Sequence, residues 1–387
     1  MSTVPRRVAV LTTGRQDWGI LRSVCTGIAS QPSLRTVVVA GGMHLSPAHG
    51  STIDLVRADG WDPVALAPWL PVDGATPPPP ADAQAAGALA AVGAWLRDAR
   101  PGALVLVGDR LETAAAALAA TLAGVPVVHL HGGEQTFGAF DDALRHAVTK
   151  LAHLHLVSHE EHRRRVIALG EDPGSVHVVG APGLDNLHRA DLPDRASLAA
   201  DLGIALDRGP VVVVTVHPAT LETDAAATSL AVAEAMREVP ATYVVTLPNP
   251  DPGGETVNRT MQEVAAEVGG VAVGALGERR YWGLLRVADA MLGNSSSGLI
   301  EAPAVRLPVV NVGDRQAGRR REANVLDAPA DGSAVAAALR RALDPSLRAV
   351  LVAPDPAATD GRAGERAGRI IAAWQPPHPP RKPPVPA

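Results

Sequence analysis

Four carboxylates stand where an enzyme could use them to move protons. Asp109 and Glu134 each follow a short apolar run, and Asp141 and Asp142 come soon after Glu134. Carboxylates that crowd one place repel each other, so some should hold a proton more tightly than usual, as a general acid or base must. The same residues could instead cap helix N-termini. The sequence predicts a catalytic role for at least one of the four.

A second pattern is typical of anion binding. A stretch of small and hydroxyl-bearing residues precedes Glu301 and consists of Asn294, Ser295, Ser296, Ser297 and Gly298. Small residues let the backbone approach a diphosphate closely, and N–H groups and hydroxyls at the start of a helix can bind it. Glu301 could accept hydrogen bonds from a ribose. The alternative interpretation is an ordinary helix cap on a flexible turn.

Another possible anion site is the first turn of the chain, Gly14 to Asp17, which carries Arg15. A cation and free N–H groups at a helix N-terminus would favour a phosphate there. A solvated arginine in a simple strand-to-helix turn is the alternative. The chain contains neither G-x-G-x-x-G nor G-x-x-x-x-G-K-[ST], so it has neither the dinucleotide fingerprint nor a P-loop.

Five histidines crowd one region of the chain: His129, His131, His146, His153 and His155. Alternation along a strand would put the first two on one face, and the last two likewise. No H-E-x-x-H pattern occurs, and a glycine-rich loop is a poor platform for metal ligands. We therefore favour packing or substrate contacts over a metal site. His217, after another apolar run, is a stronger candidate for a group that faces a ligand.

These residues follow short β-rich apolar runs that alternate with Ala- and Leu-rich helical stretches. The alternation predicts repeated βαβ units and parallel sheets. Helices are expected from about residue 20 to 30 and over 112–123. The expected strands are 7–12, 35–40, 104–107, 126–130, 154–157 and 176–179 in a first half, and 210–215, 242–246, 288–292 and 308–312 in a second. In open α/β sheets, ligands bind beyond the carboxyl ends of the strands, where these polar residues occur.

The composition agrees with such a fold and limits the function. A chain of 387 residues suggests two or three domains. Only 3% of the residues are aromatic, so aliphatic side chains must form the cores, as in parallel sheets covered by helices. The formal charge of −5 gives no basic excess for nucleic acid or an anionic membrane. A single cysteine, Cys25, excludes an internal disulfide framework and fits a reducing cytoplasm.

Several further motifs occur in order along the chain. They are Gly41-Gly42-Met43-His44-Leu45-Ser46-Pro47, Gly108-Asp109-Arg110-Leu111-Glu112, His131-Gly132-Gly133-Glu134, Asp141-Asp142-Ala143-Leu144-Arg145-His146, His217-Pro218-Ala219-Thr220, Pro248-Asn249-Pro250-Asp251, Asn294 to Glu301, and Gly313-Asp314-Arg315-Gln316. Together they resemble the hydrolysing UDP-N-acetylglucosamine 2-epimerases, and relatives of that family that act on 2,4-diacetamido sugar nucleotides. The resemblance covers about residues 8 to 325.

The resemblance implies an α/β GT-B fold, in which two Rossmann-like doubly wound domains have a cleft between them for the nucleotide sugar. The N-terminal domain, which would carry the sugar and the catalytic carboxylates, would be 1–187. The C-terminal, UDP-binding domain would be 188–358. A helix in 359–374 would cross back to the first domain, and the proline-rich tail would be 375–387.

The family reaction is elimination of UDP to a glycal, followed by hydration to free N-acetylmannosamine. By resemblance Asp109, Glu134 and Asp141 are catalytic, with Asp142 as their neighbour. Residues implied to bind the substrate are Arg15, Asp17, His44, Arg145, His217, Asn249, Asn294, Ser295, Ser296, Ser297, Gly298, Glu301 and Arg315. The resemblance implies no metal, no other cofactor, a UDP-sugar as partner, and a homodimer or homotetramer. The alternatives are a non-hydrolysing 2-epimerase, a GT-B glycosyltransferase and a sugar-nucleotide-binding protein without activity.

Overall fold

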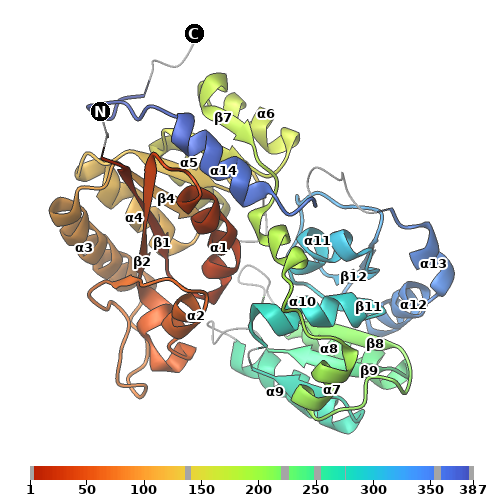
Figure 1. The fold of residues 1–387 in the computed structure, drawn as a ribbon. Coiled ribbons are helices and arrows are strands. Elements are labelled where there is room, and N and C mark those ends of the chain that lie inside the picture. The colour runs from red at the N-terminus through yellow and green to blue at the C-terminus, as the bar shows by residue number, and fades with distance from the viewer. Residues whose placement is uncertain are drawn as a thin grey trace. The chain divides into compact units, whose positions relative to one another are not determined.

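The chain forms two compact units, each built around its own parallel sheet (Figure 1). The structure is a computed structural model that describes residues 4–135, 141–218, 226–247, 254–274, 276–352 and 359–382. Unit 1 contains the described residues up to 134, then 141–186 and 359–382. Unit 2 contains the described residues of 187–352. The predicted α/β class with two Rossmann-like sheets is confirmed.

Within the described residues, the sheet of unit 1 has the strand order β3-β2-β1-β4-β5-β6-β7, with every pairing parallel. The strands are β1 Arg6–Thr12, β2 Leu34–Ala40, β3 Val64–Ala65, β4 Ala103–Val107, β5 Val127–Leu130, β6 Leu154–Val157 and β7 Val176–Val178. The order reverses between β1 and β4, because the chain first builds outward to β2 and then returns. Such a switch point is where α/β sheets bind ligands, beyond the carboxyl ends of the strands.

Helices cover both faces of this sheet. They are α1 Arg15–Ala29, α2 Ile53–Ala58, α3 Ala81–Ala99, α4 Leu111–Leu122, α5 Asp141–Leu151, α6 Glu160–Ala168 and α14 Ala363–Ala373. Alternate residues of β1 point to opposite faces: Val8 and Val10 pack in the core with α1 and α14, whereas Ala9 and Leu11 pack with α3 and α4. The period-2 alternation of small aliphatic residues therefore explains how a chain poor in aromatics fills two cores.

The C-terminal helix α14 lies directly against α1, at the other end of the chain (Figure 1). A Cβ atom on Gly364 would lie 2.3 Å from the carbonyl oxygen of Ser23, and one on Gly368 would lie 2.0 Å from that of Gly27. The carboxylate of Asp185 accepts hydrogen bonds from the first two N–H groups of α14, at 3.1 and 2.8 Å. The helix is thus an integral part of unit 1.

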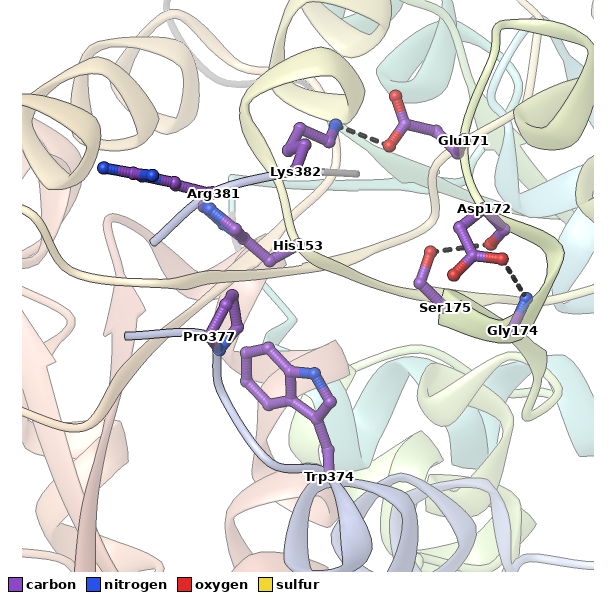
Figure 2. Close-up of a pocket in the computed structure, with 9 residues that line it drawn as sticks. All are labelled: His153, Glu171, Asp172, Gly174, Ser175, Trp374, Pro377, Arg381 and Lys382. Carbon is purple, nitrogen blue, oxygen red and sulfur yellow. Dashed lines mark hydrogen bonds and ion pairs between the residues drawn. The ribbon is translucent and has the colours of Figure 1, made fainter. Parts of the chain in front are cut away.

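The segment after α14 contacts unit 1 through Lys382, whose Nζ lies 2.5 Å from Glu171 Oε2 (Figure 2). Glu171 is buried and also binds Lys150 at 2.7 Å and His155 at 3.1 Å. Burial alone would raise the pKa of Glu171, but the hydrogen bonds from these three side chains outweigh it and lower the pKa to about 2. A hollow of about 260 Å³ beside Lys382 is lined by His153, Trp374 and their neighbours, and by none of the predicted site residues.

Unit 2 repeats the architecture. Within the described residues its sheet has the order β10-β9-β8-β11-β12-β13, again with every pairing parallel. The strands are β8 Val211–Thr215, β9 Thr242–Thr246, β10 Val271–Val273, β11 Ala290–Gly293, β12 Val309–Val312 and β13 Val325–Ala328. The helices are α7 Arg195–Leu202, α8 Ala227–Glu238, α9 Gly254–Glu267, α10 Gly277–Val287, α11 Ser297–Ile300, α12 Gly332–Ala342 and α13 Pro345–Val350. The order reverses here between β8 and β11.

Two features differ from the sequence prediction. Helix α1 begins at Arg15, not near residue 20, because Asp17 accepts hydrogen bonds from the N–H and hydroxyl of Thr13 and so completes the first turn. The short strands β3, β10 and β13 were not predicted, since edge strands of two to four residues carry little periodicity.

Across the part of the chain that the structure describes, none of the helices combines the length and apolar character needed to span a membrane.

Candidate active site

Arg145 joins three of the predicted acidic positions in unit 1. Its guanidinium is almost fully buried and donates hydrogen bonds to the Asp109 carboxylate, to Asp142 Oδ1 at 3.0 Å and to the carbonyl oxygen of Glu134 at 2.8 Å. Asp109 follows β4, Glu134 follows β5 and Asp142 opens α5. The side chains of Asp109 and Asp142 are 23% and 21% exposed, so solvent or a ligand can reach both.

This contact pattern decides the chemistry available to the acidic group. One buried cation between two carboxylates offsets the repulsion that would otherwise push them apart. Arg145 was predicted to contact the substrate, yet the described contacts of its guanidinium are with protein groups. The arginine therefore builds the site, and its role as a substrate contact stays a prediction. Asp141 begins α5 and is partly exposed.

The Glu134 side chain is held by a histidine of the same loop. His131 Nδ1 lies 2.7 Å from Glu134 Oε1, and the Ser158 hydroxyl donates to the same oxygen at 3.4 Å. The loop itself is fixed because Arg165 donates a hydrogen bond to the carbonyl oxygen of Gly133. His131 was one of five histidines singled out in the sequence, but neither its pairing with Glu134 nor its buried position was predicted.

A second histidine positions the turn that carries Asp109. His129 is fully buried, and its Nε2 donates a hydrogen bond to the carbonyl oxygen of Gly108 at 2.8 Å. The Thr149 hydroxyl lies 3.2 Å from its Nδ1, which therefore accepts. Burial lowers the pKa of His129 to about 3, so the ring is neutral at physiological pH. Neutral imidazole gives the Gly108 turn a fixed support without adding charge beside Asp109.

Near β1 and β2, two predicted substrate residues are engaged with the protein. Asp17 is buried, and Thr13 donates two hydrogen bonds to its carboxylate, at 2.9 and 2.6 Å. His44 has no exposed surface, and the hydroxyls of Thr12 and Thr52 contact its two ring nitrogens at 2.8 and 2.9 Å. These contacts hold the loops after β1 and β2 in place. The prediction that either residue binds substrate remains untested.

In unit 2, Asn294 ties together the loops that follow three strands. Its side-chain amide exchanges two hydrogen bonds with the backbone of His217, at 2.7 and 2.9 Å. Its carbonyl oxygen accepts from Arg315 at 3.0 Å and from Gln316 at 2.9 Å. Gly293 must be glycine, since its φ is +135° and a Cβ would lie 2.0 Å from the Thr215 carbonyl oxygen. The structure thus gathers His217, Asn294 and Arg315 at the carboxyl ends of β8, β11 and β12.

The serine-rich loop has a partner that sequence reasoning missed. Tyr281 of α10 donates a hydrogen bond to Ser297 Oγ at 2.6 Å. Burial, with the charge of nearby Glu301, raises the pKa of Tyr281, so the phenol keeps its proton and acts as the donor. The hydroxyl hydrogen of Ser297 then remains available to an anion. Ser295, Ser296, Gly298 and Glu301 occupy the same short stretch of chain around α11.

Three further predictions concern Asn249, Arg15 and a metal site. Asn249 lies outside the described residues. Arg15 is the first residue of α1, and burial lowers the pKa of its guanidinium. Over the described ranges, no three His, Cys, Asp or Glu side chains are grouped as the ligands of a metal ion would be.

Two Rossmann-like sheets with polar residues gathered at their strand ends define an α/β protein of the GT-B type. A family model described as UDP-N-acetylglucosamine 2-epimerase matches residues 27–372, and the chain belongs to this family.

Relatives agree with this assignment. The chain is 33% identical over 341 residues to a protein of Legionella pneumophila named UDP-N,N'-diacetylbacillosamine 2-epimerase (hydrolyzing), a match covering 88% of this chain and 89% of the relative. It is 31% identical over 336 residues to polysialic acid biosynthesis protein P7 of Escherichia coli, covering 85% and 84%. The crystal structure of the Neisseria meningitidis UDP-GlcNAc 2-epimerase bound to UDP-GlcNAc has the same fold, with a TM-score of 0.81, 16% identity, and coverage of 95% of this chain and all of that one.

Proposed function

We propose that this protein is a hydrolysing 2-epimerase that converts UDP-N-acetylglucosamine, or a related 2-acetamido sugar nucleotide, to UDP and the free sugar inverted at C2. The observation that carries the proposal is the convergence of Asp109, Asp142 and the Glu134 loop on Arg145. Relatives named as hydrolysing 2-epimerases match most of the chain and support the same activity.

The reaction needs acid–base groups and stabilisation of positive charge. As UDP leaves C1, positive charge develops there and the C2 proton becomes acidic, so a base can remove it and form the glycal. Carboxylates fixed beside that carbon would stabilise the cation and take part in proton transfer. We assign this work to the acidic group of unit 1, in which Arg145 holds Asp109 and Asp142, with Glu134 and Asp141 beside them.

Unit 2 supplies groups for the departing nucleotide. Negative charge grows on the diphosphate as the C1–O bond breaks, and hydroxyl and N–H donors stabilise it. We assign Ser295, Ser296 and Ser297 to the diphosphate and Glu301 to the ribose hydroxyls. The Tyr281–Ser297 hydrogen bond orients one of these donors.

Two candidates exist for the sugar of the substrate. A 2,4-diacetamido sugar nucleotide is the second candidate, because two of the relatives, at 33% and 31% identity, are named as 2-epimerases of nucleotide-linked N,N'-diacetylbacillosamine. A panel of UDP-linked 2-acetamido sugars with and without a 4-acetamido group would rank the two candidates by kcat/KM.

One assay tests the reaction class. The protein is incubated with each sugar nucleotide in D2O and the products are followed by NMR. We expect UDP and a free 2-epimeric sugar that carries deuterium at C2. A product that retains UDP would identify a non-hydrolysing epimerase, and UDP release only with an added acceptor would identify a glycosyltransferase.

The Asp109→Asn variant tests the acidic group directly. Asparagine keeps the shape of the side chain but removes its charge, so we expect turnover to fall by at least about a hundredfold with the fold intact. Steady-state UDP release measures turnover, and circular dichroism checks the fold. Near-normal turnover would remove Asp109 from the reaction. Asp172→Asn, in an exposed turn of unit 1, is the matched control.

A further inference from the structure

The backbone at His131 adopts a conformation that favours glycine. The residue directly follows β5 with a φ of +62°, and its N–H donates to the Leu156 carbonyl oxygen at 3.2 Å. A bulky side chain in the left-handed region costs about 1–3 kcal/mol and persists where the surrounding structure enforces it, often at functional sites. An imidazole therefore stands at a strand end where a glycine would be relaxed.

The two ring nitrogens of His131 have different surroundings. Nδ1 lies 2.7 Å from Glu134 Oε1, and a carboxylate can only accept, so Nδ1 carries the hydrogen. Nε2 is then left with a lone pair. This atom is buried and has no hydrogen-bond partner among the described residues. A histidine whose one nitrogen is held by a carboxylate while the other is unused has the arrangement of a positioned general base.

Glu134 is placed to hold the ring. Its side chain is 11% exposed, and the carboxylate accepts from both His131 and the Ser158 hydroxyl. Its backbone carbonyl is bound by Arg145, the same side chain that binds Asp109 and Asp142. These contacts connect the His131–Glu134 pair to the acidic group.

We propose that His131 is the catalytic base that removes the C2 proton, and that Glu134 is its positioning residue. The proposal rests on the 2-epimerase function above. The Nε2 lone pair binds the proton, the C2–H electron pair becomes the C1=C2 π bond, and the C1–O bond breaks with its electrons on the departing UDP. Glu134 stabilises the imidazolium, which releases its proton to solvent when the cycle closes.

This assignment divides the work between imidazole and carboxylates. Imidazole is by its ordinary chemistry a stronger base than a carboxylate, whereas Asp109 and Asp142 are paired with Arg145. The two aspartates then stabilise the positive charge at C1. Inversion requires a proton on the opposite face of C2, so in the hydration step one of these carboxylates takes up a proton from solvent and gives it to C2. Water supplies the hydroxyl to C1 and releases its remaining proton to solvent, so the carboxylate ends the cycle as it began.

The groups around His131 leave Glu134 as the carboxylate that supports its ring. His129 of β5 and His162 of α6 are neutral near pH 7, because burial lowers their pKa values to about 3 and about 4. Arg165 of α6 and Arg145 of α5 face the same loop, and both bind its carbonyl oxygens. Glu134 is the carboxylate in direct contact with the ring. Glu134→Gln should therefore lower kcat with little change in KM, since an amide stabilises imidazolium less than a carboxylate does.

Chemical rescue of His131→Gly provides the test. Glycine is relaxed at a φ of +62°, so the variant should fold, and the missing imidazole leaves room for a small base. We expect kcat to fall by at least about a hundredfold. Added imidazole should then raise the kcat of the variant by at least about tenfold. The matched control is Arg100→Gly, an exposed residue at φ +42°, which should keep wild-type turnover without any response to imidazole.

The outcomes separate this inference from the proposed function. Rescue by imidazole, together with a lower kcat at nearly unchanged KM in Glu134→Gln, supports it. A wild-type protein that releases UDP, beside a His131→Gly variant that imidazole does not rescue, overturns the role of His131 alone. If the wild type releases no UDP from any sugar nucleotide of the panel, the proposed function fails and the role of His131 fails with it.

Discussion

At the scale of single residues, Arg145 controls the site through its position as much as through its charge. It reaches Asp109 after β4, Asp142 at the start of α5 and the backbone of Glu134 after β5. The planar guanidinium with its several N–H donors can bind all three at once. One side chain thus fixes the spacing of the acidic group and places a positive charge within it.

The Arg145→Lys variant tests this role. An ammonium group keeps the charge but cannot donate to three partners in the same geometry. We expect turnover to fall by about ten- to a hundredfold, and the free energy of unfolding of unit 1 to fall by about 2 kcal/mol as the two carboxylates lose charge-assisted hydrogen bonds. Kinetics of UDP release and chemical denaturation measure the two effects.

Arg57→Lys is the control, since that arginine pairs with Asp54 at 2.8 Å on the exposed surface of α2, where such a change costs about 1 kcal/mol or less. Equal behaviour of the two variants would mean that Arg145 forms an ordinary salt bridge.

Some contacts of these residues can be predicted from the amino-acid sequence, and others cannot. The spacing of Asp142 and Arg145 on one helix made their contact foreseeable. The contact of Arg145 with Asp109 joins residues on different elements, and so does that of Tyr281 with Ser297. Such pairs depend on how strands and helices pack, which local patterns do not specify. The candidate acidic residues were foreseeable, but the hydrogen bonds that assign them roles were not.

At the scale of elements, the close packing of α1 against α14 depends on glycines where the two helices cross. Backbone atoms of the two helices approach so closely at Gly27, Gly364 and Gly368 that no Cβ fits. Helices that approach so closely have small residues where they cross, as seen also between membrane helices. The glycines lower helix propensity, so the close contact must compensate for that loss.

We expect Gly368→Val to push α14 off α1. Its Cβ would lie 2.0 Å from the Gly27 carbonyl oxygen, so the backbone must move, at a cost of about 1–3 kcal/mol or more. The melting temperature of unit 1 should fall, and protease should cleave near α14 sooner. Ala373→Val, at an exposed position of the same helix, should change neither. If Gly368→Val melts like the wild type, the contact contributes little to stability.

The long elements were foreseeable because their hydrophobic periodicity is strong. The ten strands expected from apolar runs all occur, with ends shifted by a residue or two. The strands that were missed are β3, β10 and β13, at the edges of the sheets, where pairing with one neighbour stabilises a few residues of weak pattern. The early start of α1 was missed because it depends on one side chain, Asp17, that replaces a backbone partner.

At the scale of the whole molecule, the buried charge of Glu171 links three parts of unit 1. Its carboxylate binds Lys150 of α5, His155 of β6 and Lys382 of the C-terminal segment. The pKa of Glu171 is lowered to about 2 in the folded chain, below the usual value of a glutamate. The folded state therefore favours the ionised form.

This shift predicts how stability depends on pH. A lowered folded-state pKa contributes stability that is fully present above the unfolded value, near pH 4.5, and is lost as pH falls toward 2. The Glu171→Gln variant should lack the contribution, on the order of 3 kcal/mol at pH 7. Denaturation curves at several pH values measure the gap to wild type, which should close as acid is added. A gap that does not change with pH would contradict the prediction. Glu160→Gln, at an exposed position of α6 in unit 1, is the control.

The path of the chain has a consequence for the order of events during synthesis. Unit 1 contains the first strand and also α14, whose Ala367 and Ile371 complete the core over β1 and α1. Unit 2 is encoded between them, so all of its described residues precede α14. A ribosome must therefore finish unit 2 while one apolar face of unit 1, covered by α1, still lacks α14. During translation this apolar surface stays exposed until α14 emerges, unless a chaperone binds it. Slow or interrupted elongation beyond residue 352 would therefore make the nascent chain prone to aggregation.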